Sequence, residues 1–323
     1  MAVYTQVSAE AAAKLLARYD VGKLVSLKGI AEGVENSNYL LETERARFIL
    51  TLYESRVDPA DLPYFHNLLA HLHKAGCPVP RFIDDRQGNW LQDLLGKKAC
   101  LIEFLPGISV SEPTPIQAAA VGKSMAQMHK AVGGFSEAKP NPLGQESWKP
   151  LFERCDRAAA ESLLPGLADD IARECDWLEA NWPSDLPKHA VHTDLFPDNV
   201  LFRGDAVGGL IDFYFACTDF RAFDLAVTHA AWSFSNDGKS YLADIGLALL
   251  QGYGEVIQLS DAEKQTFALL ARGASLRFLL TRLYDWINTP AGALVTRKDP
   301  LAFYRRLEFY RSADAASLFG VEQ

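Results

Sequence analysis

The N-terminal third of the chain alternates between short apolar runs and turn residues. Ser8 precedes the apolar-periodic stretch Ala9–Tyr19 and is a residue type that caps helices, so a short helix is predicted there. The next apolar runs, separated by turns, predict three strands of an antiparallel sheet. These strands cover Leu24–Lys28, Tyr39–Glu42 and Phe48–Tyr53.

One more helix and two more strands are predicted before residue 105. Leucine and phenylalanine recur at helical spacing over Asp61–Ala75, and Gly76 follows the end of that stretch. The strands are predicted near Arg81–Asp85 and Ala99–Phe104. Leu105-Pro106-Gly107 then interrupts the pattern, as expected of a hinge.

Beyond residue 107 the apolar spacing is mainly helical. Thr114 and Gln117 have the spacing of a capping box with Pro115 at the first helical position, which predicts a helix ending near Ala131. Further helices are predicted over Glu146–Ser162, Leu167–Asn181, Ala222–Ser233, Lys239–Glu255, Asp261–Trp286 and Pro300–Ala316. A hairpin interrupts them, with arms at Asn199–Phe202 and Gly209–Asp212.

These elements predict an α+β fold with two lobes. Residues 1–105 would form a lobe built on an antiparallel sheet, and residues 106–323 a mainly helical lobe. A chain of 323 residues is more often divided in this way than folded around one core.

Composition and charge limit the kinds of molecule that the protein is expected to bind. Lys and Arg number 32 against 41 Asp and Glu, which gives a formal charge of −9, so neither nucleic acid nor an anionic membrane is an expected partner. The five cysteines are far apart and odd in number, which favours free thiols in a reducing compartment over a disulfide framework or a zinc site. The sequence shows neither a signal peptide nor an apolar stretch long enough to cross a bilayer, so a cytoplasmic protein is expected.

The hairpin is flanked by the residues that point to chemistry. His192-Thr193-Asp194 is followed after four residues by Asn199, and Asp212 stands at the end of the second arm, before Phe213. Phosphoryl transfer from ATP requires a carboxylate beside the acceptor hydroxyl and oxygen ligands for Mg²⁺. We therefore predict Asp194 as the catalytic base and Asn199 and Asp212 as metal ligands. We expect His192 to orient the backbone of this loop and not to transfer a proton.

The turn over residues 29–38 is the candidate phosphate-binding segment. Glycine lets backbone N–H groups approach phosphate oxygens closely, although G-x-x-x-G spacing is equally typical of an ordinary hairpin turn. Glu103 and Leu105 follow a strand and could present backbone groups to adenine. The predicted nucleotide-binding residues are Gly29, Gly33, Asn36, Ser37, Asn38, Thr51, Glu103 and Leu105.

The arrangement resembles the aminoglycoside phosphotransferase and choline kinase superfamily and, within it, the bacterial homoserine kinase family. The resemblance extends over essentially the whole chain. It is carried by GIAEGVENSNYLL (29–41), FILTLYE (48–54), HTDLFPDNVLF (192–202), IDFYFAC (211–217) and RGASLRFLLTRLYDWINTPAGALV (272–295). It implies a bilobal protein-kinase-like fold, the cofactors ATP and Mg²⁺, and L-homoserine as the small-molecule substrate, on the way to threonine.

The chain departs from the broader kinase pattern in two places. Thr51 stands where the third strand of a kinase offers a lysine or arginine to the phosphates, and the predicted helix Asp61–Ala75 contains no glutamate. Both members of the usual ion pair are therefore missing, which avoids leaving one buried charge unpaired. The phosphate charge must then be met by Mg²⁺, by the glycine turn and by Lys28.

An amino-acid acceptor needs a cation for its carboxylate and an anion for its ammonium group. Arg277, Tyr284 and Asp285 share one face of the helix Asp261–Trp286, although a surface ion pair would show the same spacing. Arg282 lies on another face and is a second candidate, and Tyr214 could form a wall of the site.

Two other functions fit parts of this pattern. A kinase of the same superfamily could act on another small alcohol, such as choline, methylthioribose or an aminoglycoside. A regulatory protein that binds nucleotide without turnover is the alternative from another class, but it would usually lack Asp194, Asn199 or Asp212.

Overall fold

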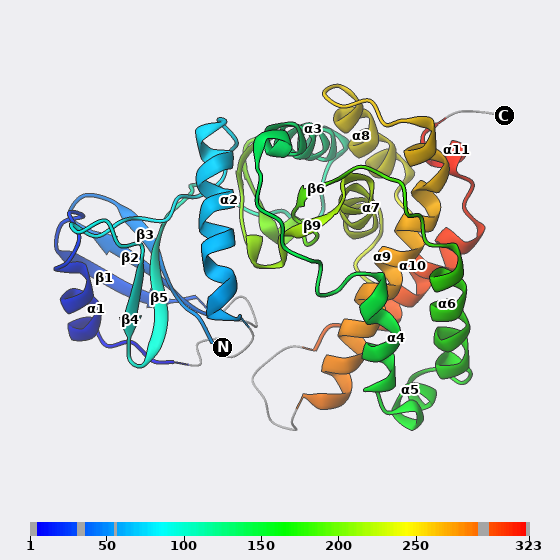
Figure 1. Ribbon diagram of the computed structural model, residues 1–323, viewed down its shortest axis with the longest axis horizontal. Coiled ribbons are helices and arrows are strands. Elements are labelled where there is room, and N and C mark those ends of the chain that lie inside the picture. The colour runs from blue at the N-terminus through cyan, green and yellow to red at the C-terminus, as the bar shows by residue number, and fades with distance from the viewer. Residues whose placement is uncertain (1–4, 31–35, 55–56, 290–296, 321–323) are drawn as a thin grey trace. The chain divides into compact units, whose positions relative to one another are not determined.

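The computed structural model describes residues 5–30, 36–54, 57–289 and 297–320. Its chain forms two compact units, one ending at Pro106 and the other beginning at Gly107 (Figure 1). The first unit is built on a sheet and the second is mainly helical, so the predicted α+β class is confirmed.

The first unit is organised around a five-stranded antiparallel sheet in the order β1-β2-β3-β5-β4. The bounds are β1 Leu24–Gly29, β2 Ser37–Thr43, β3 Arg47–Leu52, β4 Leu91–Leu94 and β5 Lys97–Glu103. Residues along β2 alternate between buried and more exposed positions, which places one face of the strand on the core. Tyr39 of β2 faces Leu50 of β3 in the register, and both side chains are buried.

Helix α1 (Ala9–Leu16) packs against β1, and its leucines extend the core of the sheet. It begins as predicted, because the Ser8 side chain accepts a hydrogen bond from the Ala11 backbone N–H. Helix α2 (Leu62–Lys74) also matches its prediction and buries the periodic apolar face that indicated it.

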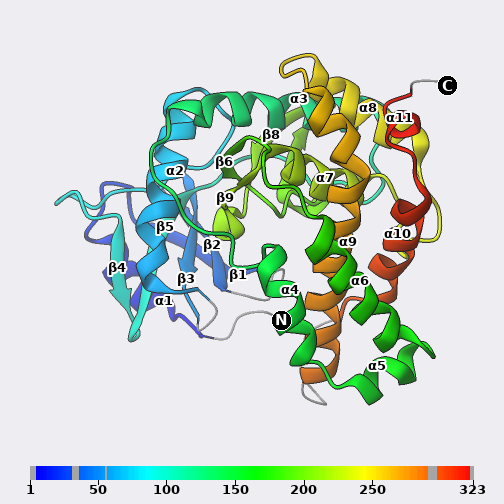
Figure 2. The ribbon, with the colours of Figure 1, turned by 45° about the vertical axis from the view of Figure 1, so that its right-hand side comes forward.

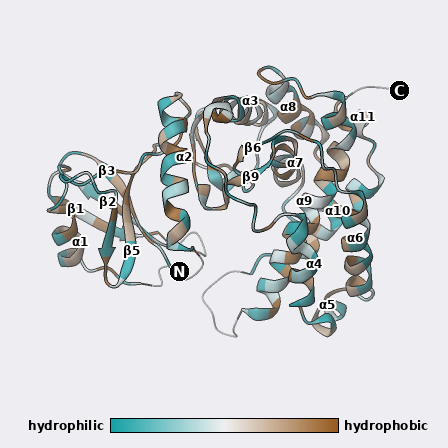
Figure 3. Cartoon of the chain, in the orientation of Figure 1, coloured by the Kyte–Doolittle hydropathy of each residue, from teal (hydrophilic) through white to brown (hydrophobic). Residues whose placement is uncertain are grey.

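Helices make up most of the second unit (Figure 2). Their bounds are α3 Pro115–Ala131, α4 Gln145–Glu153, α5 Arg157–Leu163, α6 Leu167–Asn181, α7 Arg221–Trp232, α8 Ala243–Gly254, α9 Asp261–Asn288, α10 Leu301–Ser312 and α11 Ala315–Leu318. The long helix α9 is central to the packing, because α4, α7, α10 and α11 all contact it. Helix α6 carries both hydrophilic and hydrophobic residues (Figure 3), as expected of a helix with one face in the core.

Two small antiparallel sheets accompany these helices. The predicted hairpin is present as β7 (Val200–Arg203) paired with β8 (Ala206–Leu210). The second pair joins β6 (Lys188–Val191) to β9 (Cys217–Phe220), and the sequence analysis missed it. Within the described residues, no helix is long and apolar enough to span a membrane.

Three sequence predictions were wrong, each for a local reason. No strand forms over 81–85, because the Asp85 side chain accepts from the backbone N–H groups of Gln87 and Asn89 and closes a turn. The helix predicted over 146–162 is broken, since the Asp156 side chain caps a new helix. The helix predicted over 300–316 is interrupted in the same way, with Asp314 capping α11.

Helices α3 and α8 approach each other closely at two glycines. A Cβ atom added to Gly122 would lie 2.0 Å from the Leu249 carbonyl oxygen. One added to Gly252 would lie 2.0 Å from the Ala119 carbonyl oxygen. Both obstacles are backbone atoms of the facing helix, so neither can yield by a rotamer change.

We predict that Gly122→Ala lowers the free energy of unfolding by about 1–3 kcal/mol, because the added methyl group forces the two helices apart. Urea unfolding of the purified protein measures this loss. Gly133→Ala is the matched control, because a Cβ atom at Gly133 would meet nothing within 4 Å. Equal stabilities for the two variants would contradict the close approach of α3 and α8.

Candidate active site

The segment from His192 to Asn199, here called the catalytic loop, connects β6 to β7. Strand β6 ends at Val191, and a short 3₁₀ turn over Pro197–Asn199 leads into β7. His192 and Thr193 have no exposed surface, whereas Asp194 is half-buried. The first two residues of the loop are therefore enclosed by protein, whereas Asp194 keeps some accessible surface.

A buried carboxylate from α7 binds the start of this loop. Asp224 is fully buried and accepts hydrogen bonds from the backbone N–H groups of His192 at 2.8 Å and Thr193 at 2.6 Å. His129 on α3 adds a third contact, 2.9 Å from its Nε2 to Asp224 Oδ2. Burial alone would raise the pKa of Asp224, but these hydrogen bonds hold it below the ordinary value.

Two further contacts fix carbonyl groups of the loop. Arg277 on α9 donates from Nη1 to the Thr193 carbonyl oxygen at 2.5 Å. Trp232 on α7 donates from its indole N–H to the Leu195 carbonyl oxygen at 2.8 Å. Thr193 has a φ of +60°, in the left-handed region that a β-branched residue adopts only when its surroundings require it. The hydrogen bonds from Arg277 and Trp232 hold the backbone in this conformation.

His192 orients the loop in the way the sequence analysis expected. Its Nδ1 accepts from the Asp194 backbone N–H at 3.2 Å, so its Nε2 carries the proton and donates to the Ile211 carbonyl oxygen at 3.0 Å. Burial lowers the pKa of His192, which favours this neutral form. One imidazole therefore connects the catalytic loop to the end of β8.

Asn199 lies against the predicted base. Its amide Nδ2 donates to the Asp194 carbonyl oxygen at 2.7 Å and to Asp194 Oδ2 at 3.2 Å. The Ile211 backbone N–H donates to the Asn199 carbonyl oxygen at 3.0 Å, which ties Asn199 to the residue before Asp212. The side-chain oxygen of Asn199 remains available for a metal ion.

Asp212 follows β8 in a left-handed conformation, with φ +65° and ψ +62°. The residue is solvent-accessible, so a metal ion can reach it. The surrounding protein still removes enough solvent to raise the pKa of Asp212 to about 6, and the charge of Asp198 adds to this. Burial likewise raises the pKa of Asp194 well above its ordinary value, although the cation Arg277 opposes the shift.

The donor set suits Mg²⁺ better than a softer metal. Asp212 and Asn199 offer carboxylate and amide oxygens, the hard ligands that Mg²⁺ prefers. The described part of the chain contains no cluster of three His, Cys, Asp or Glu side chains that could hold a metal ion. Such a cluster is not needed, because Mg²⁺ usually takes one or two protein ligands and completes its shell with water and phosphate oxygens.

The predicted nucleotide-binding residues of the first unit are largely satisfied by one another. Thr51 is buried and donates to the Asn38 side-chain oxygen at 2.7 Å. Ser37 is buried and donates to Glu54, which also pairs with Lys97 at 2.6 Å. Asn36 accepts from the Glu54 backbone N–H.

The remaining nucleotide-binding candidates lie at strand ends. Gly29 ends β1 and pairs with Tyr39, and Gly33 lies outside the described residues. Glu103 ends β5, where its side chain accepts from Arg81 Nε at 3.1 Å. Leu105 is half-buried and lies beyond that strand.

The predicted acceptor residues do not form one group. Arg277 is 1% exposed and binds loop backbone, which differs from the accessible position expected for it. The Tyr284 hydroxyl accepts from Arg154, the residue after α4, at 2.8 Å. Asp285 is half-buried on the same helix, and Tyr214 is half-buried two residues after Asp212.

Arg282 lies in a different environment. Its Nη1 donates to the Asp299 backbone oxygen at 3.3 Å, and its guanidinium lies 4.4 Å from the centre of the Phe303 ring. The charges of Asp194 and Asp198 act on it, so it lies nearer to the catalytic loop than its place on a second helix face suggested.

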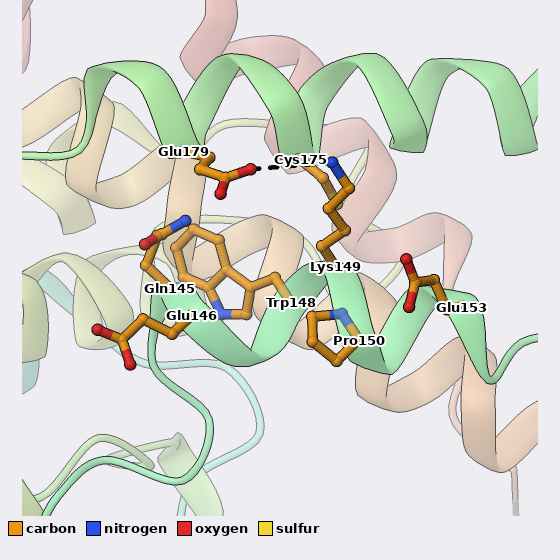
Figure 4. A pocket seen from close by; sticks show the side chains of 8 residues that line it. All are labelled: Gln145, Glu146, Trp148, Lys149, Pro150, Glu153, Cys175 and Glu179. Atoms are coloured by element: carbon orange, nitrogen blue, oxygen red, sulfur yellow. Dashed lines mark ion pairs between the residues drawn. The ribbon is translucent and has the colours of Figure 1, made fainter.

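Helices α4 and α6 border a cavity of about 280 Å³ (Figure 4). Its lining includes Trp148 and Cys175 together with the ion pair of Lys149 and Glu179. None of the catalytic-loop residues lines it, so we assign it no part in phosphoryl transfer.

Comparison with known proteins identifies relatives over the whole chain. Residues 26–259 match the model of the phosphotransferase enzyme family. The homoserine kinase of Zymomonas mobilis is 49% identical over 98% of this chain and 99% of its own length. The homoserine kinase of Rhizobium rhizogenes is 49% identical over the full length of both chains. Among solved structures, amicoumacin kinase in complex with AMP-PNP and Ca²⁺ is 15% identical in sequence. It superposes over 94% of this chain and 96% of its own with a TM-score of 0.71, so the two proteins share a fold.

We predict that Asp224→Asn destabilises the protein by about 2–4 kcal/mol at pH 7, since an amide cannot accept from all three donors. Asp176→Asn is the control, because Asp176 forms an exposed ion pair with Lys149. Its loss should lower the free energy of unfolding by less than about 1 kcal/mol.

The effect of Asp224 should also depend on pH. A carboxyl whose folded-state pKa is depressed contributes stability above the unfolded value of about 4, and this contribution is lost as the pH falls through the folded value. Urea unfolding at a series of pH values measures the difference between wild type and variant. A difference that stays constant down to pH 3 would argue against an ionised Asp224.

Proposed function

The chain belongs to the phosphotransferase enzyme family, and we propose from this that it transfers the γ-phosphoryl group of ATP to L-homoserine. The products are O-phospho-L-homoserine and ADP. The observation that carries the proposal is 49% identity to homoserine kinases over essentially the whole chain. It is supported by a preformed catalytic loop that contains Asp194 and Asn199, and by Asp212 at the end of β8.

Asp194 acts as the base. The acceptor hydroxyl attacks the γ-phosphorus, the bond to the ADP oxygen breaks, and the hydroxyl proton passes to an Asp194 carboxylate oxygen. A raised pKa makes Asp194 a better proton acceptor than an ordinary aspartate. Asn199 fixes the carboxylate through its contact with Oδ2, so the proton-accepting atom is positioned before the substrate binds.

Asn199 and Asp212 would hold Mg²⁺, through the Asn199 side-chain oxygen and the Asp212 carboxylate. A metal ion held there would offset the negative charge that develops during phosphoryl transfer. The left-handed backbone at Asp212 presents its carboxylate at the end of β8, which is tied to Asn199 through the Ile211 backbone.

The first unit would bind the nucleotide. Gly29 and Gly33 would approach the phosphates, and Asn36, Ser37, Asn38 and Thr51 would contribute to the same site. Pairing between β3 and β5 ends at Glu103, so the backbone groups from there to Leu105 are the candidates for adenine. Thr51 cannot contribute charge, so phosphate binding would depend on backbone N–H groups, Mg²⁺ and Lys28.

Another small alcohol is the alternative acceptor. Turnover of ATP with L-homoserine, choline, methylthioribose and an aminoglycoside distinguishes these substrates in one assay. We expect phosphorylation of L-homoserine, and preferential phosphorylation of another acceptor would overturn the assignment.

The reaction is proposed to take place in the cytoplasm. All five cysteines are buried and unpaired, which suits a reducing compartment.

We predict that Asp194→Asn retains ATP binding but lowers kcat by about 10²–10⁴-fold, because proton acceptance and hydroxyl positioning are lost together. Steady-state turnover and calorimetric nucleotide titration measure the two effects. Asp205→Asn is the control, since Asp205 is exposed in the turn between β7 and β8. A near-normal kcat for Asp194→Asn would exclude Asp194 as the base.

Asp212→Ala should raise the Mg²⁺ concentration required for half-maximal rate more than Asn199→Ala does, because Asp212 contributes a full charge. Mg²⁺ titrations of the initial rate for both variants measure this order. Unchanged Mg²⁺ dependence in Asp212→Ala would remove Asp212 from the metal site.

A further inference from the structure

Two arginines on neighbouring helices share one aromatic ring. Arg282 belongs to α9 and Arg306 to α10, which lie side by side in both ribbon views (Figures 1 and 2). The Arg282 guanidinium lies 4.4 Å from the centre of the Phe303 ring, and that of Arg306 lies 4.2 Å from the same centre. The two cations are therefore separated by no more than the sum of these distances.

The ring connects them to the catalytic loop. Phe303 packs 6.0 Å from Phe196 and 5.0 Å from Phe278, and Phe196 and Phe278 are 4.8 Å apart. Phe196 follows Asp194 by two residues, so the pair of arginines is adjacent to the reacting end of the loop.

The positive charge of the pair has no carboxylate partner among the described residues. Arg306 is 3% exposed, and only its Nη2 has an acceptor, the Ser235 carbonyl oxygen at 3.1 Å. Its Nε and Nη1 are buried without one. Among the described residues, the one hydrogen-bond acceptor of the Arg282 guanidinium is the Asp299 backbone oxygen, and the charges of Asp299, Asp194 and Asp198 act on it without forming an ion pair.

Among the described residues of this unit, three other enclosed arginines pair with carboxylates, whereas Arg277 has no such partner and binds the Thr193 carbonyl oxygen. Arg221 pairs with Glu263 at 2.7 Å, Arg272 pairs with Glu174, and Arg311 pairs with Asp170 at 2.7 Å. A buried cation without a partner costs several kcal/mol, so two of them side by side require an anion. Burial lowers the pKa of each to about 10, which still leaves both protonated at neutral pH.

We propose that Arg282 and Arg306 form the subsite that binds the α-carboxylate of the acceptor amino acid, which rests on the proposed function. Arg282 is half-buried and meets the ligand first, and Arg306 supplies the deeper donors Nε and Nη1. A guanidinium fork matches a carboxylate with two parallel N–H donors. Two methylene groups separate the α-carbon from the hydroxyl in homoserine, so binding the carboxylate here leaves the hydroxyl free to reach Asp194.

The test compares homoserine with 3-aminopropan-1-ol, which has the same amine and hydroxyl but no carboxylate. For Arg282→Met and Arg306→Met, kcat/KM with homoserine should fall about 10–100-fold, the loss expected for a charged hydrogen bond. With the decarboxylated analogue it should change less than about 2-fold, because no contact is removed. Arg282→Lys should recover part of the homoserine activity, since a point charge replaces a fork.

Stability provides an independent readout. Arg306→Met removes an unpaired buried cation and should leave the free protein as stable as wild type or more stable. L-Homoserine should raise the unfolding midpoint of wild type but not of this variant. Arg311→Met is the matched control from the same helix: it breaks a paired arginine, so it should lower stability without changing the preference for homoserine over the analogue.

Three outcomes would overturn the proposal, and they are distinguishable. An equal loss with both alcohols would make the arginines structural, and a raised KM for ATP would make them a phosphate site. If wild type phosphorylates other alcohols but not homoserine, the proposed function fails and the carboxylate subsite fails with it.

Discussion

The buried carboxylate of Asp224 is the interaction on which the active site depends. It accepts from the backbone N–H groups of two successive residues, His192 and Thr193, where the chain turns through a left-handed conformation. The backbone N–H groups of His192 and Thr193 both point toward Asp224, so neither can be paired in the ladder of a strand or the turns of a helix. The Asp224 side chain supplies the acceptor that both N–H groups need. The full burial of Asp224 is tolerated because three donors surround it.

The rest of the loop is fixed from other elements, so its geometry does not depend on the substrate. Arg277 and Trp232 bind carbonyl groups from α9 and α7, and Asn199 binds Asp194 from within the loop. A loop fixed in this way needs little reorganisation when charge moves during the reaction, which is the general basis of electrostatic preorganisation. The same enclosure raises the pKa of Asp194 and so suits it to accept a proton.

Charge in the second unit is arranged in two ways. Around Glu174 and Glu263, arginines are neutralised by carboxylates and stabilise packing between helices. Around Phe303, two arginines lie on an aromatic ring and lack carboxylate partners among the described residues. Cation–π contacts moderate the cost of burying them without cancelling their charge. Three other enclosed arginines of this unit have carboxylate partners, whereas the two on Phe303 keep a positive charge that suits the proposed anion site.

The features that could be predicted from the sequence are those that residues adjacent in the chain determine. The spacing of Asp194, Asn199 and Asp212 and the hairpin between them were readable, because adjacent residues determine a turn and two short strands. Helix α3 and its capping box were predicted for the same reason. The α+β class followed from the change of apolar spacing after residue 107.

Only the tertiary structure decided which helical side chains meet the loop. Periodicity placed Arg277 on a helix face but could not tell that this face lies against Thr193, 84 residues away in the chain. Asp224 interrupts the apolar run Ala222–Val227 of α7, which is a signal of a buried polar partner. The contact of Arg306 with the ring next to Arg282 depends on how α10 packs on α9. The sequence by itself determined the chemistry and the local elements, whereas non-local packing decided which charges are neutralised and which remain for a ligand.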